Sequence, residues 1–566
     1  MTPPIAQDAT AYAQMAGRLH PQLLKGLAQM KYEKMTPVQQ QVLSLPTFTQ
    51  DCLVQAKTGT GKTIAFLLPA LHTLITQKSV PRGQVGVLVM APTRELAQQI
   101  ADECNKLTAV CKPPLECHIA VGGSNKNALL SRFLNGNPTI LVATPGRLND
   151  YLTDPKVRSK FTDIRCVILD EADRMLDQGF KPAIIKILSS MPPKAQSSWQ
   201  GMCFSATMPP EINSVLHLVL DKNHARISTI SENDEPTVSS IPQAVVPVAG
   251  VEDVFTALHS LLSCERFDNP NLKAVIFSST ARQAALMYHI FASTGGASPA
   301  KLPVYQMHSR MGQGARNRTV EEFKATERGL LFASDVVGRG MDFPDVGLVV
   351  QVGLPSDKEQ YVHRVGRTGR AGKVGHAVMI LTPEEMSFVK KNPEFPIKNT
   401  GVIHPKAAAV PSADIIQAAL AKIPEQAKMQ AYVAFLGFTK TLMKSLNTNS
   451  AGIVALANRF SKSMGLSEPP ELEPSTVGKM GLKGVPGLNI RGKSSGPRPD
   501  TRNVRNPFAD TRTANPAPGG NRGQFGGGAG GSRGAKKPLD SSPGPASQTK
   551  SPGGEPRRKR PKQETK

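Results

Sequence analysis

The sequence predicts an α/β protein with two tandem doubly wound parallel-sheet domains, followed by a helical extension and a basic tail. Short, continuously apolar segments alternate with helical stretches in two parts of the chain. Such segments are typical of strands that are buried on both faces of a parallel sheet. A proline-containing segment divides the two parts. The length of 566 residues also exceeds what one hydrophobic core usually supports.

The first domain is expected over residues 1–235. Its apolar segments are separated by stretches with helical spacing, and this alternation predicts a doubly wound sheet. The strand candidates are residues 52–55, 86–91, 119–121, 139–143, 166–169 and 201–205.

A linker is expected over residues 236–250, where Pro236, Pro242 and Pro247 interrupt regular structure. The second α/β domain is expected over residues 251–391. Its strand candidates are residues 274–278, 304–307, 329–333, 347–352 and 375–381.

Residues 392–480 change to helical spacing, for example at 413–423 and 426–436, and show no strand signal. They predict a small helical extension. The tail, residues 481–566, is rich in Gly, Pro and Ser, and it holds 18 Lys and Arg against five acidic residues. Such a composition buries too little surface to offset chain entropy, so we expect disorder there.

The charge indicates the class of partner. The chain has a net charge of +24, concentrated in the tail, which favours nucleic acid, with an anionic membrane surface or mere solvation of the tail as alternatives. The longest apolar stretch, residues 66–75, is interrupted by Pro69 and His72 and is too short to span a bilayer. Seven scattered cysteines without a CxxC pair argue for a reducing compartment and against disulfides or a zinc site.

A glycine-rich segment, AKTGTGKT at residues 56–63, follows the first strand candidate and precedes a helical stretch. This is the pattern of a P-loop that binds ATP, with alanine where the strictest form has glycine. The glycines let backbone N–H groups converge on phosphate oxygens. Lys62 would neutralise phosphate charge and Thr63 would bind Mg²⁺. The expected ATP-binding residues of the loop are Ala56, Lys57, Thr58, Gly59, Thr60, Gly61, Lys62 and Thr63.

An acidic pair ends another strand candidate, in CVILDEAD at residues 166–173. Asp170 is placed to hold Mg²⁺, and Glu171 to orient and deprotonate the attacking water. A single acid in this position often only caps the next helix. The P-loop upstream in the same domain favours the catalytic interpretation.

Residues 170–173 read Asp-Glu-Ala-Asp, and with about ten further blocks in order this sequence resembles the DEAD-box RNA helicases over residues 12–381. The resemblance implies two RecA-like domains that close on ATP and separate short RNA duplexes. In MTPVQ (residues 35–39), Gln39 would read adenine, with Tyr12 as the stacking aromatic. The implied RNA contacts of the first domain are Pro92, Arg94, Gly122, Gly123, Thr144 and Arg147.

In the second domain, VIFSST (275–280), a Q-x-x-R element, SDVVGRGMD (334–342) and HRVGRTGR (363–370) resemble the family's remaining blocks, with Ser334 and a Val-Gly pair as mild departures. The implied RNA contacts here are Thr280, Gln313, Arg316 and Ser334. Arg367 and Arg370 would be catalytic arginine fingers, and Asp342 would contact the ribose. The residues implied to couple hydrolysis to strand separation are Asp173, Ser205, Thr207 and His363.

Within the family, MTPVQQ, AKTGTGKT, GRGMDFPDV, the extension and the tail resemble the fungal mitochondrial RNA chaperones that assist intron splicing and translation. This resemblance implies the mitochondrial matrix and a monomer that binds RNA. The N-terminus lacks the character of a transit peptide, and PRRKRPK (556–562) fits a nuclear signal or a phosphate grip, so nucleus and cytoplasm stay open.

Two functional alternatives also stay open: an ATP-gated RNA clamp that remains bound, and a translocating DNA helicase. The extension is expected either to pack on the second domain or to add RNA contacts that bend the exiting strand.

Overall fold

The computed structural model describes residues 10–491, except residues 58, 78, 124, 178, 209–211, 231–240, 295–301, 338–340, 342, 370–373 and 401–410. Thr58, Asp342 and Arg370 therefore lie outside the described residues, as do most of the predicted linker and residues 492–566 of the predicted tail.

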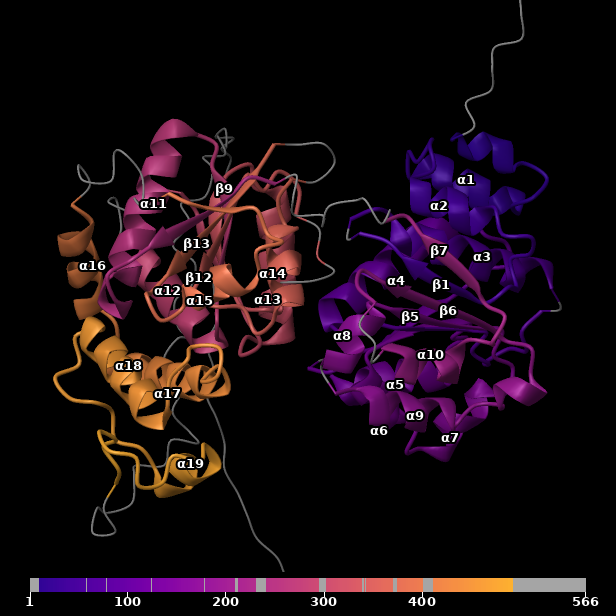
Figure 1. Ribbon diagram of the computed structural model, residues 1–566. Coiled ribbons are helices and arrows are strands. Elements are labelled where there is room, and N and C mark those ends of the chain that lie inside the picture. Colours follow the sequence, from indigo (N-terminus) through magenta and orange to yellow (C-terminus); the bar gives the residue numbers. More distant parts are fainter. Residues whose placement is uncertain are drawn as a thin grey trace, which may run out of the picture. The chain divides into compact units, whose positions relative to one another are not determined.

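The first domain is built on a sheet with the order β3-β4-β2-β5-β6-β1-β7, in which neighbouring strands run parallel (Figure 1). Its strands are β1 (Cys52–Gln55), β2 (Val87–Met90), β3 (Cys117–Ala120), β4 (Ile140–Ala143), β5 (Cys166–Asp170), β6 (Gln200–Ser205) and β7 (Ala225–Ser228). The six predicted strands are confirmed within two residues. β7 escaped prediction because only Ile227 in it is buried.

Alternate strand residues bury their side chains on opposite faces of this sheet. Cys52 and Val54 pack with helices α1 to α4, whereas Leu53 packs with the later helices. The helices are η1 (Tyr12–Met15), α1 (Pro21–Gln29), α2 (Pro37–Leu43), α3 (Lys62–Thr76), α4 (Arg94–Thr108), α5 (Lys126–Asn135), α6 (Pro145–Tyr151), α7 (Pro155–Arg158), η2 (Ser159–Phe161), α8 (Ala172–Asp177), α9 (Lys181–Leu188), η3 (Lys194–Gln196) and α10 (Asn213–Val219).

The second domain repeats this plan, with strands in the order β10-β11-β9-β12-β13-β8-β14, and neighbours are again parallel. The strands are β8 (Gln243–Pro247), β9 (Lys273–Ser278), β10 (Val304–Met307), β11 (Gly329–Ala333), β12 (Leu348–Val352), β13 (His376–Leu381) and β14 (Ile397–Asn399). The helices are η5 (Val251–Asp253), α11 (Val254–Asp268), α12 (Ala281–Ser293), α13 (Gln313–Ala325), α14 (Lys358–Val365) and α15 (Ser387–Lys391).

Two sequence-based expectations are wrong here. The predicted linker 236–250 contains β8, which pairs with β13, because prolines at the borders of a strand do not prevent its pairing. The extension, in which no strand was expected, contains β14, a three-residue edge strand with two exposed residues. Neither strand has the continuous apolar run of a central parallel strand.

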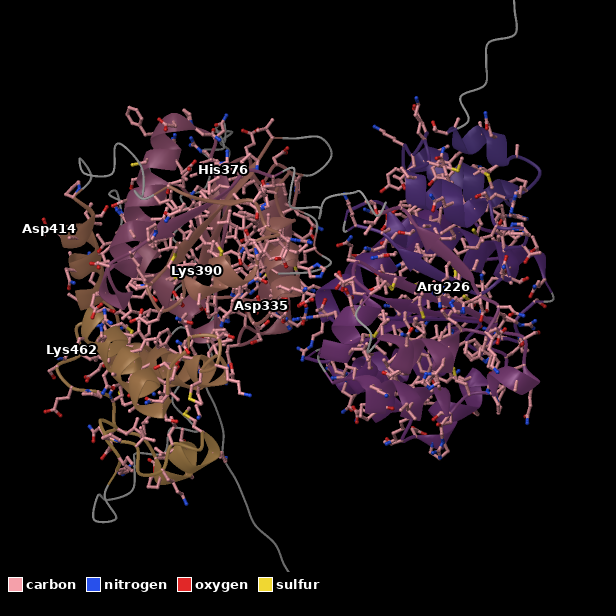
Figure 2. The ribbon with its side chains drawn as sticks, in the orientation of Figure 1. Arg226, Asp335, His376, Lys390, Asp414 and Lys462 are labelled. Carbon is pink, nitrogen blue, oxygen red and sulfur yellow. The ribbon has the colours of Figure 1, made fainter. Side chains whose placement is uncertain are left out.

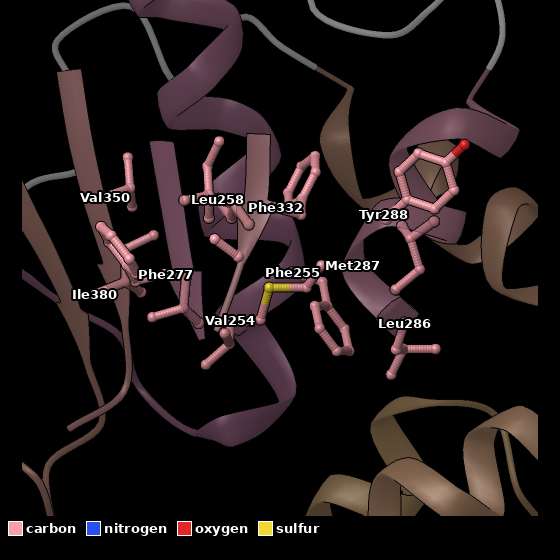
Figure 3. Packing of buried hydrophobic residues seen from close by; sticks show 14 of the residues in the cluster. Val254, Phe255, Leu258, Phe277, Leu286, Met287, Tyr288, Phe332, Val350 and Ile380 are labelled. Atoms are coloured by element: carbon pink, nitrogen blue, oxygen red, sulfur yellow. The ribbon is translucent and has the colours of Figure 1, made fainter. Parts of the chain in front are cut away.

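The core of the second domain continues into the helical extension. Figure 3 shows Phe255 of α11 and Met287 of α12 packed beside Phe277 and Phe332 of the sheet. The same cluster includes Phe460 and other residues of the extension. The extension helices are α16 (Ser412–Ala421), α17 (Glu425–Thr441), α18 (Ser450–Ser463) and α19 (Pro474–Lys479). This continuity supports the interpretation of the extension as a packing element.

No helix among the described residues has both the length and the apolar character needed to cross a bilayer.

Candidate functional site

The glycine-rich loop between β1 and α3 has the backbone that phosphate binding requires. Gly59 and Gly61 have φ angles of +78° and +87°, a left-handed conformation that favours glycine. α3 begins at Lys62, directly after the loop, so the positive end of the helix dipole faces it. Backbone amides and the helix dipole can thus act together on a phosphate group.

The Lys62 side chain is buried inside this loop. Its Nζ donates to the carbonyl oxygens of Ala56 (2.8 Å) and Lys57 (3.2 Å). Burial lowers the pKa of Lys62, and the carboxylates of Asp170 and Glu171 oppose this shift. The ammonium group therefore stands next to the acidic pair, where it can neutralise phosphate charge. Thr60 closes the loop by donating its hydroxyl to the Lys57 carbonyl at 2.8 Å.

The two acids at the end of β5 are both buried. Burial raises the pKa of Asp170 to about 6, although the Lys62 ammonium opposes the shift. The backbone N–H of Glu171 donates to Asp170 Oδ1 at 3.0 Å. Glu171 has a φ angle of +52°, and such left-handed backbone in a residue other than glycine stores strain, which is common at functional sites.

Asp170 and Thr63 fit a magnesium ion that arrives with a nucleotide. Both offer oxygen ligands to one cavity, and Mg²⁺ in such sites usually takes one or two protein oxygens together with substrate phosphates. A cation would offset the desolvation that raises the pKa of Asp170. Within the described residues, no group of three or more His, Cys, Asp or Glu could hold a metal ion.

Gln39 joins the expected base-recognition segment to the phosphate loop. Its Oε1 accepts the Tyr12 hydroxyl at 2.7 Å and the Thr36 N–H at 2.8 Å. Its Nε2 donates to the Gly61 carbonyl at 3.0 Å. The orientation of the amide is thereby fixed, as selective hydrogen bonding to a base requires.

Tyr12 and Tyr32 differ in their access to the nucleotide cavity. Tyr12, expected to stack on adenine, is 4% exposed, so its ring is covered and its hydroxyl supports Gln39. Tyr32, absent from the sequence-based set, is 41% exposed and lines the same cavity as Gly59 and Gly61. Its place seven positions before Gln39 is the sequence feature that could have identified Tyr32 as a residue of the nucleotide cavity.

The predicted coupling residues of the first domain form one hydrogen-bonded network. Asp173 Oδ2 accepts the Thr207 hydroxyl at 2.7 Å and the Thr207 N–H at 3.2 Å. The Ser205 hydroxyl donates to the Thr207 carbonyl at 2.7 Å. The end of β6 is thereby tied to the helix that starts after Glu171. A change at the acidic pair can therefore reach the loop after β6.

The second domain contributes a buried arginine to the nucleotide cavity. Arg367 donates its Nε to the His363 carbonyl at 3.1 Å and its Nη1 to the Met341 carbonyl. A cavity of about 800 Å³ includes among its lining residues Gly59, Gly61, Lys62, Thr63, Asp170, Glu171 and Arg367. Residues of both domains therefore face one space.

A second buried arginine, Arg364, was not among the predicted site residues. Its Nε and Nη2 lie 2.8 Å and 2.7 Å from Asp335 Oδ1, a carboxylate labelled in Figure 2. The Gln360 Nε2 donates to the same oxygen at 2.7 Å. These bonds fix the turn after β11 against α14, so Arg364 holds the helix that directly precedes Arg367.

The predicted RNA contacts of the first domain gather where β2, β3 and β4 end. Arg94 opens α4, and its guanidinium group lies over the turn that follows β3. A Cβ at Gly122 would stand 3.0 Å from Arg94 Nη2, and Gly123 has a φ of +72°. Gly123 favours glycine because of its left-handed backbone, and at Gly122 the absence of a side chain lets the arginine approach the backbone closely.

The turn after β4 carries Thr144 and Arg147, which lie at the start of α6. Thr144 is buried, and Arg147 is held 3.8 Å from Asp150 Oδ2, with its guanidinium 5.7 Å from the Tyr151 ring centroid. β3, β4 and β2 are neighbours in the sheet, so these groups and Pro92, which follows β2, share one edge. The carboxyl edge of a parallel sheet is where ligands bind.

The second domain places its predicted RNA contacts on the same kind of edge. Thr280 follows β9 and caps α12, with its Oγ1 3.2 Å from the Gln283 N–H. Ser334 follows β11, the neighbour of β9. A cavity of about 380 Å³ includes among its lining residues Pro92, Arg94, Arg316 and Ser334.

Arg316 has a carboxylate partner that the sequence did not suggest. Its Nη1 lies 2.6 Å from Glu95 Oε1, and both side chains are 5% exposed. Gln313 Nε2 donates to the same oxygen at 3.1 Å. Arg316 and Gln313, both predicted to contact RNA, are therefore bonded to Glu95. An RNA phosphate that binds them would have to displace the Glu95 carboxylate or bind beside it.

Two further arginines, Arg282 and Arg310, lie near this edge of the second sheet. Neither was predicted from the sequence. Burial, together with the nearby charges of Arg282, Arg316 and Arg310, lowers the pKa of His308 to about 4. A cluster of cations around a buried imidazole creates positive potential at the end of β10. Arg282 and Arg310 lie in no block of the resemblance, so only folding reveals them.

Two family models match the chain. The DEAD/DEAH box helicase model matches residues 36–215, and the Helicase conserved C-terminal domain model matches residues 253–372. The first span contains the nucleotide loop and the acidic pair, and the second contains Thr280 and Arg367.

Curated relatives match over most of the chain. The ATP-dependent RNA helicase MSS116, mitochondrial, of Phaeosphaeria nodorum is 51% identical over 486 residues, which cover 85% of this chain and 87% of that protein. The protein of the same description in Aspergillus oryzae is 49% identical, over 85% of this chain and 76% of that protein.

Solved structures share the fold at lower identity. The DEAD-box helicase Mss116 bound to ssRNA and UDP-BeF superimposes with a TM-score of 0.75 and 26% identity, covering 86% of this chain and 99% of that one. Mss116p bound to ssRNA and AMP-PNP gives a TM-score of 0.74 and 26% identity, over 86% of this chain and 98% of that one.

Proposed function

Because this chain belongs to the DEAD-box family of ATP-dependent RNA helicases, we propose that it separates short RNA duplexes locally, by drawing its two domains together around ATP and RNA. As a member of this family it is an ATP-hydrolysing enzyme that acts on RNA. One observation carries the finer proposal: Lys62 and Glu171 of the first domain share a cavity with Arg367 of the second.

Each of these groups has a distinct task at the γ-phosphate. Glu171 orients the attacking water and accepts its proton, the contribution expected of a general base. Lys62 and Arg367 stabilise the charge that spreads over the phosphate oxygens in the transition state. Because the cations come from different domains, neither domain alone completes the site.

Magnesium is the expected companion of the nucleotide. Thr63 and Asp170 would hold it, and when bound it would neutralise phosphate charge. Burial of Asp170 supports this assignment, because Mg²⁺ would offset a desolvation cost that the Lys62 ammonium opposes only in part.

RNA would bind along the carboxyl edges of the two sheets through its backbone. The candidate contacts are arginines, hydroxyls and the glycine turn at 122–123. Such groups position phosphates without reading base sequence. ATP and RNA would each favour the same arrangement of the domains, and this is reciprocal coupling between two sites.

The proposed setting is the mitochondrion, with splicing of introns and RNA processing or translation as the role. The names of the two relatives at 51% and 49% identity include that location. The role in splicing is supported by the sequence resemblance to the fungal RNA chaperones.

Replacing Glu171 with Gln tests the proposal. The variant should retain ATP-dependent RNA binding, because the shape of the site persists, and lose turnover by about 10²- to 10⁴-fold, because the base is removed. ATP hydrolysis and RNA affinity should be measured on the same preparation. Hydrolysis at the normal rate would reject the role given to Glu171, and absence of ATP-dependent RNA binding in the wild type would reject the proposed function.

A further inference from the structure

One carboxyl group in the second domain connects the ends of three neighbouring strands. Glu385 Oε2 accepts the Thr382 N–H, just after β13, at 3.0 Å. The Leu354 N–H, after β12, also donates to the Glu385 carboxyl. The Leu354 carbonyl in turn accepts the hydroxyl of Ser279, after β9, at 3.1 Å. β9, β12 and β13 are adjacent in the sheet, so Glu385 fixes their carboxyl ends relative to one another.

Gly353 shows how closely these groups approach. A Cβ on this residue would lie 3.1 Å from Ser279 Oγ and 3.2 Å from Glu385 Oε1. Its φ of +77° also favours glycine. The Ser279 hydroxyl and the Glu385 carboxyl therefore close over a bare backbone, and this leaves Ser279 little freedom to move.

The anchored position of Ser279 limits where Thr280, the next residue, can lie. Thr280 is tied to Gln283, whose N–H and Oε1 it contacts at 3.2 Å and 3.0 Å. Thr280 is thus held by its side chain at the start of α12, its carbonyl accepts the Ser278 hydroxyl at 3.1 Å, and its N–H side is joined directly to the anchored Ser279. Thr280 is a proposed RNA contact, and a shift of 1 Å in such a group can weaken a site markedly.

The helical extension covers this carboxyl group. A small cavity of about 30 Å³ has Glu385 and Gln283 on one side and Phe435, Leu456 and Phe460 of the extension on the other. Its apolar wall continues to residues visible in Figure 3, Phe255 and Met287. The neighbouring Glu384 points elsewhere and lies 3.3 Å from Arg459 Nη1 of α18.

Stability alone does not explain an acid at this position. Burial is the main cause that raises the pKa of Glu385 to about 7; the charge of Glu384 acts in the same direction, and the hydrogen bonds from Thr382 and Leu354 oppose the shift. A raised acid pKa means that ionising the group costs folding free energy as pH rises toward 7. An apolar residue of similar volume would avoid that cost, so the hydrogen bonds to the strand ends are what distinguish a carboxyl group here.

We infer that Glu385 is a positioning residue for the RNA-contacting turn Ser279–Thr280, and that the helical extension acts on RNA affinity by covering Glu385. The inference rests on the proposed function, through the RNA contact of Thr280. The extension would then change RNA affinity without contacting RNA itself.

The test uses the full chain with Glu385→Gln, and with Glu384→Gln as the matched control in the neighbouring residue. Glu385→Gln should raise the KM for RNA in RNA-stimulated ATP hydrolysis about three- to tenfold, the scale of one hydrogen bond. The kcat at saturating RNA should be retained, because the nucleotide site is intact. Glu384→Gln should change the KM for RNA by less than about twofold, because an ion pair that is more than a third exposed contributes little. Equal effects of the two variants, or a fall in kcat with no change in KM, would overturn the inference.

A second variant keeps the test decisive if Glu385→Gln folds poorly. Ser279→Ala removes the hydroxyl at the other end of the same chain of bonds and should raise the KM for RNA in the same way. The double variant should be no worse than the poorer single variant, because residues that act through one chain are not additive. Full multiplication of the two effects, or no effect of Ser279→Ala, would contradict the positioning role.

Thr280→Ala separates this inference from the function on which it rests. If it leaves the KM for RNA unchanged, the proposed RNA contact is wrong. If it raises that KM while the Glu385 and Ser279 variants do not, only the positioning role is wrong.

Discussion

Gln39 illustrates how a single side chain can connect recognition of a base to the phosphates. Its amide is held by Tyr12 and Thr36 on one side and contacts the Gly61 carbonyl on the other. Gly61 also has no room for a side chain, because a Cβ there would collide with the Gln39 amide. A nucleotide that shifts Gln39 would therefore disturb the loop that surrounds its phosphates.

Replacing Tyr12 with Phe should weaken ATP binding without changing the chemistry. One of two donors to Gln39 Oε1 is lost, so the KM for ATP should rise about two- to tenfold while kcat at saturating ATP is retained. The matched control is Tyr432→Phe, which removes the buried hydroxyl bonded to Asn458 Oδ1 in the extension. An unchanged KM in the Tyr12 variant, or an equal change in the control, would refute the support role.

Sequence motifs identified those site residues that belong to a short local pattern along the chain. Lys62 and Glu171 are of this kind, because a loop and a strand end are local structures. Arg310 and Glu385 are not, because their partners come from turns after other strands. Such clusters exist only after the sheet has assembled, and no local pattern records them.

At the level of elements, strands with a clear apolar run were predictable, including the edge strands β3 and β10, whereas β7, β8 and β14 were not. β5 and β12 are buried throughout, so their apolar runs are continuous. β7 and β14 lie at sheet edges, where alternate or most side chains face solvent. β8 ends at Pro247, and the flanking prolines concealed a strand that is nevertheless fully paired.

The attachment of α18 to the second domain offers a comparison of two kinds of contact. Phe460 is buried, with its ring centroid 4.5 Å from that of Phe435 and 6.0 Å from that of Phe255. The next residue back, Arg459, makes a bidentate ion pair with Glu252 at 2.7 Å and 2.8 Å, but both side chains are 41% exposed. Apolar burial should therefore dominate the docking of this helix.

Phe460→Ala should lower the free energy of unfolding of the second domain by about 3–5 kcal/mol. Arg459→Ala should lower it by about 1 kcal/mol or less, because solvent screens the exposed pair. Chemical denaturation of the two full-length variants measures both. Equal losses, or a larger loss for the arginine variant, would show that ion pairing rather than apolar packing attaches the extension.

For the whole molecule, the central claim is that ATP hydrolysis needs residues from both domains. In the first domain, Lys62 begins α3 and the pair Asp170–Glu171 lies at the end of β5, whereas Arg367 follows α14 of the second domain. Because the nucleotide site has residues from both domains, a ligand that draws the domains together also completes that site. RNA that binds both domains can therefore stimulate ATP turnover. The sequence predicted this division because its motifs fall in two separate α/β patterns.

The most direct measurement is the RNA-stimulated ATP turnover of full-length Arg367→Ala, with the exposed Arg318→Ala on α13 as the control. Loss of an arginine that stabilises the transition state should lower kcat by about 10³-fold or more, while the control stays within about twofold of the wild type. Turnover of Arg367→Ala at the wild-type rate, with normal stimulation by RNA, would contradict a nucleotide site shared between the two domains.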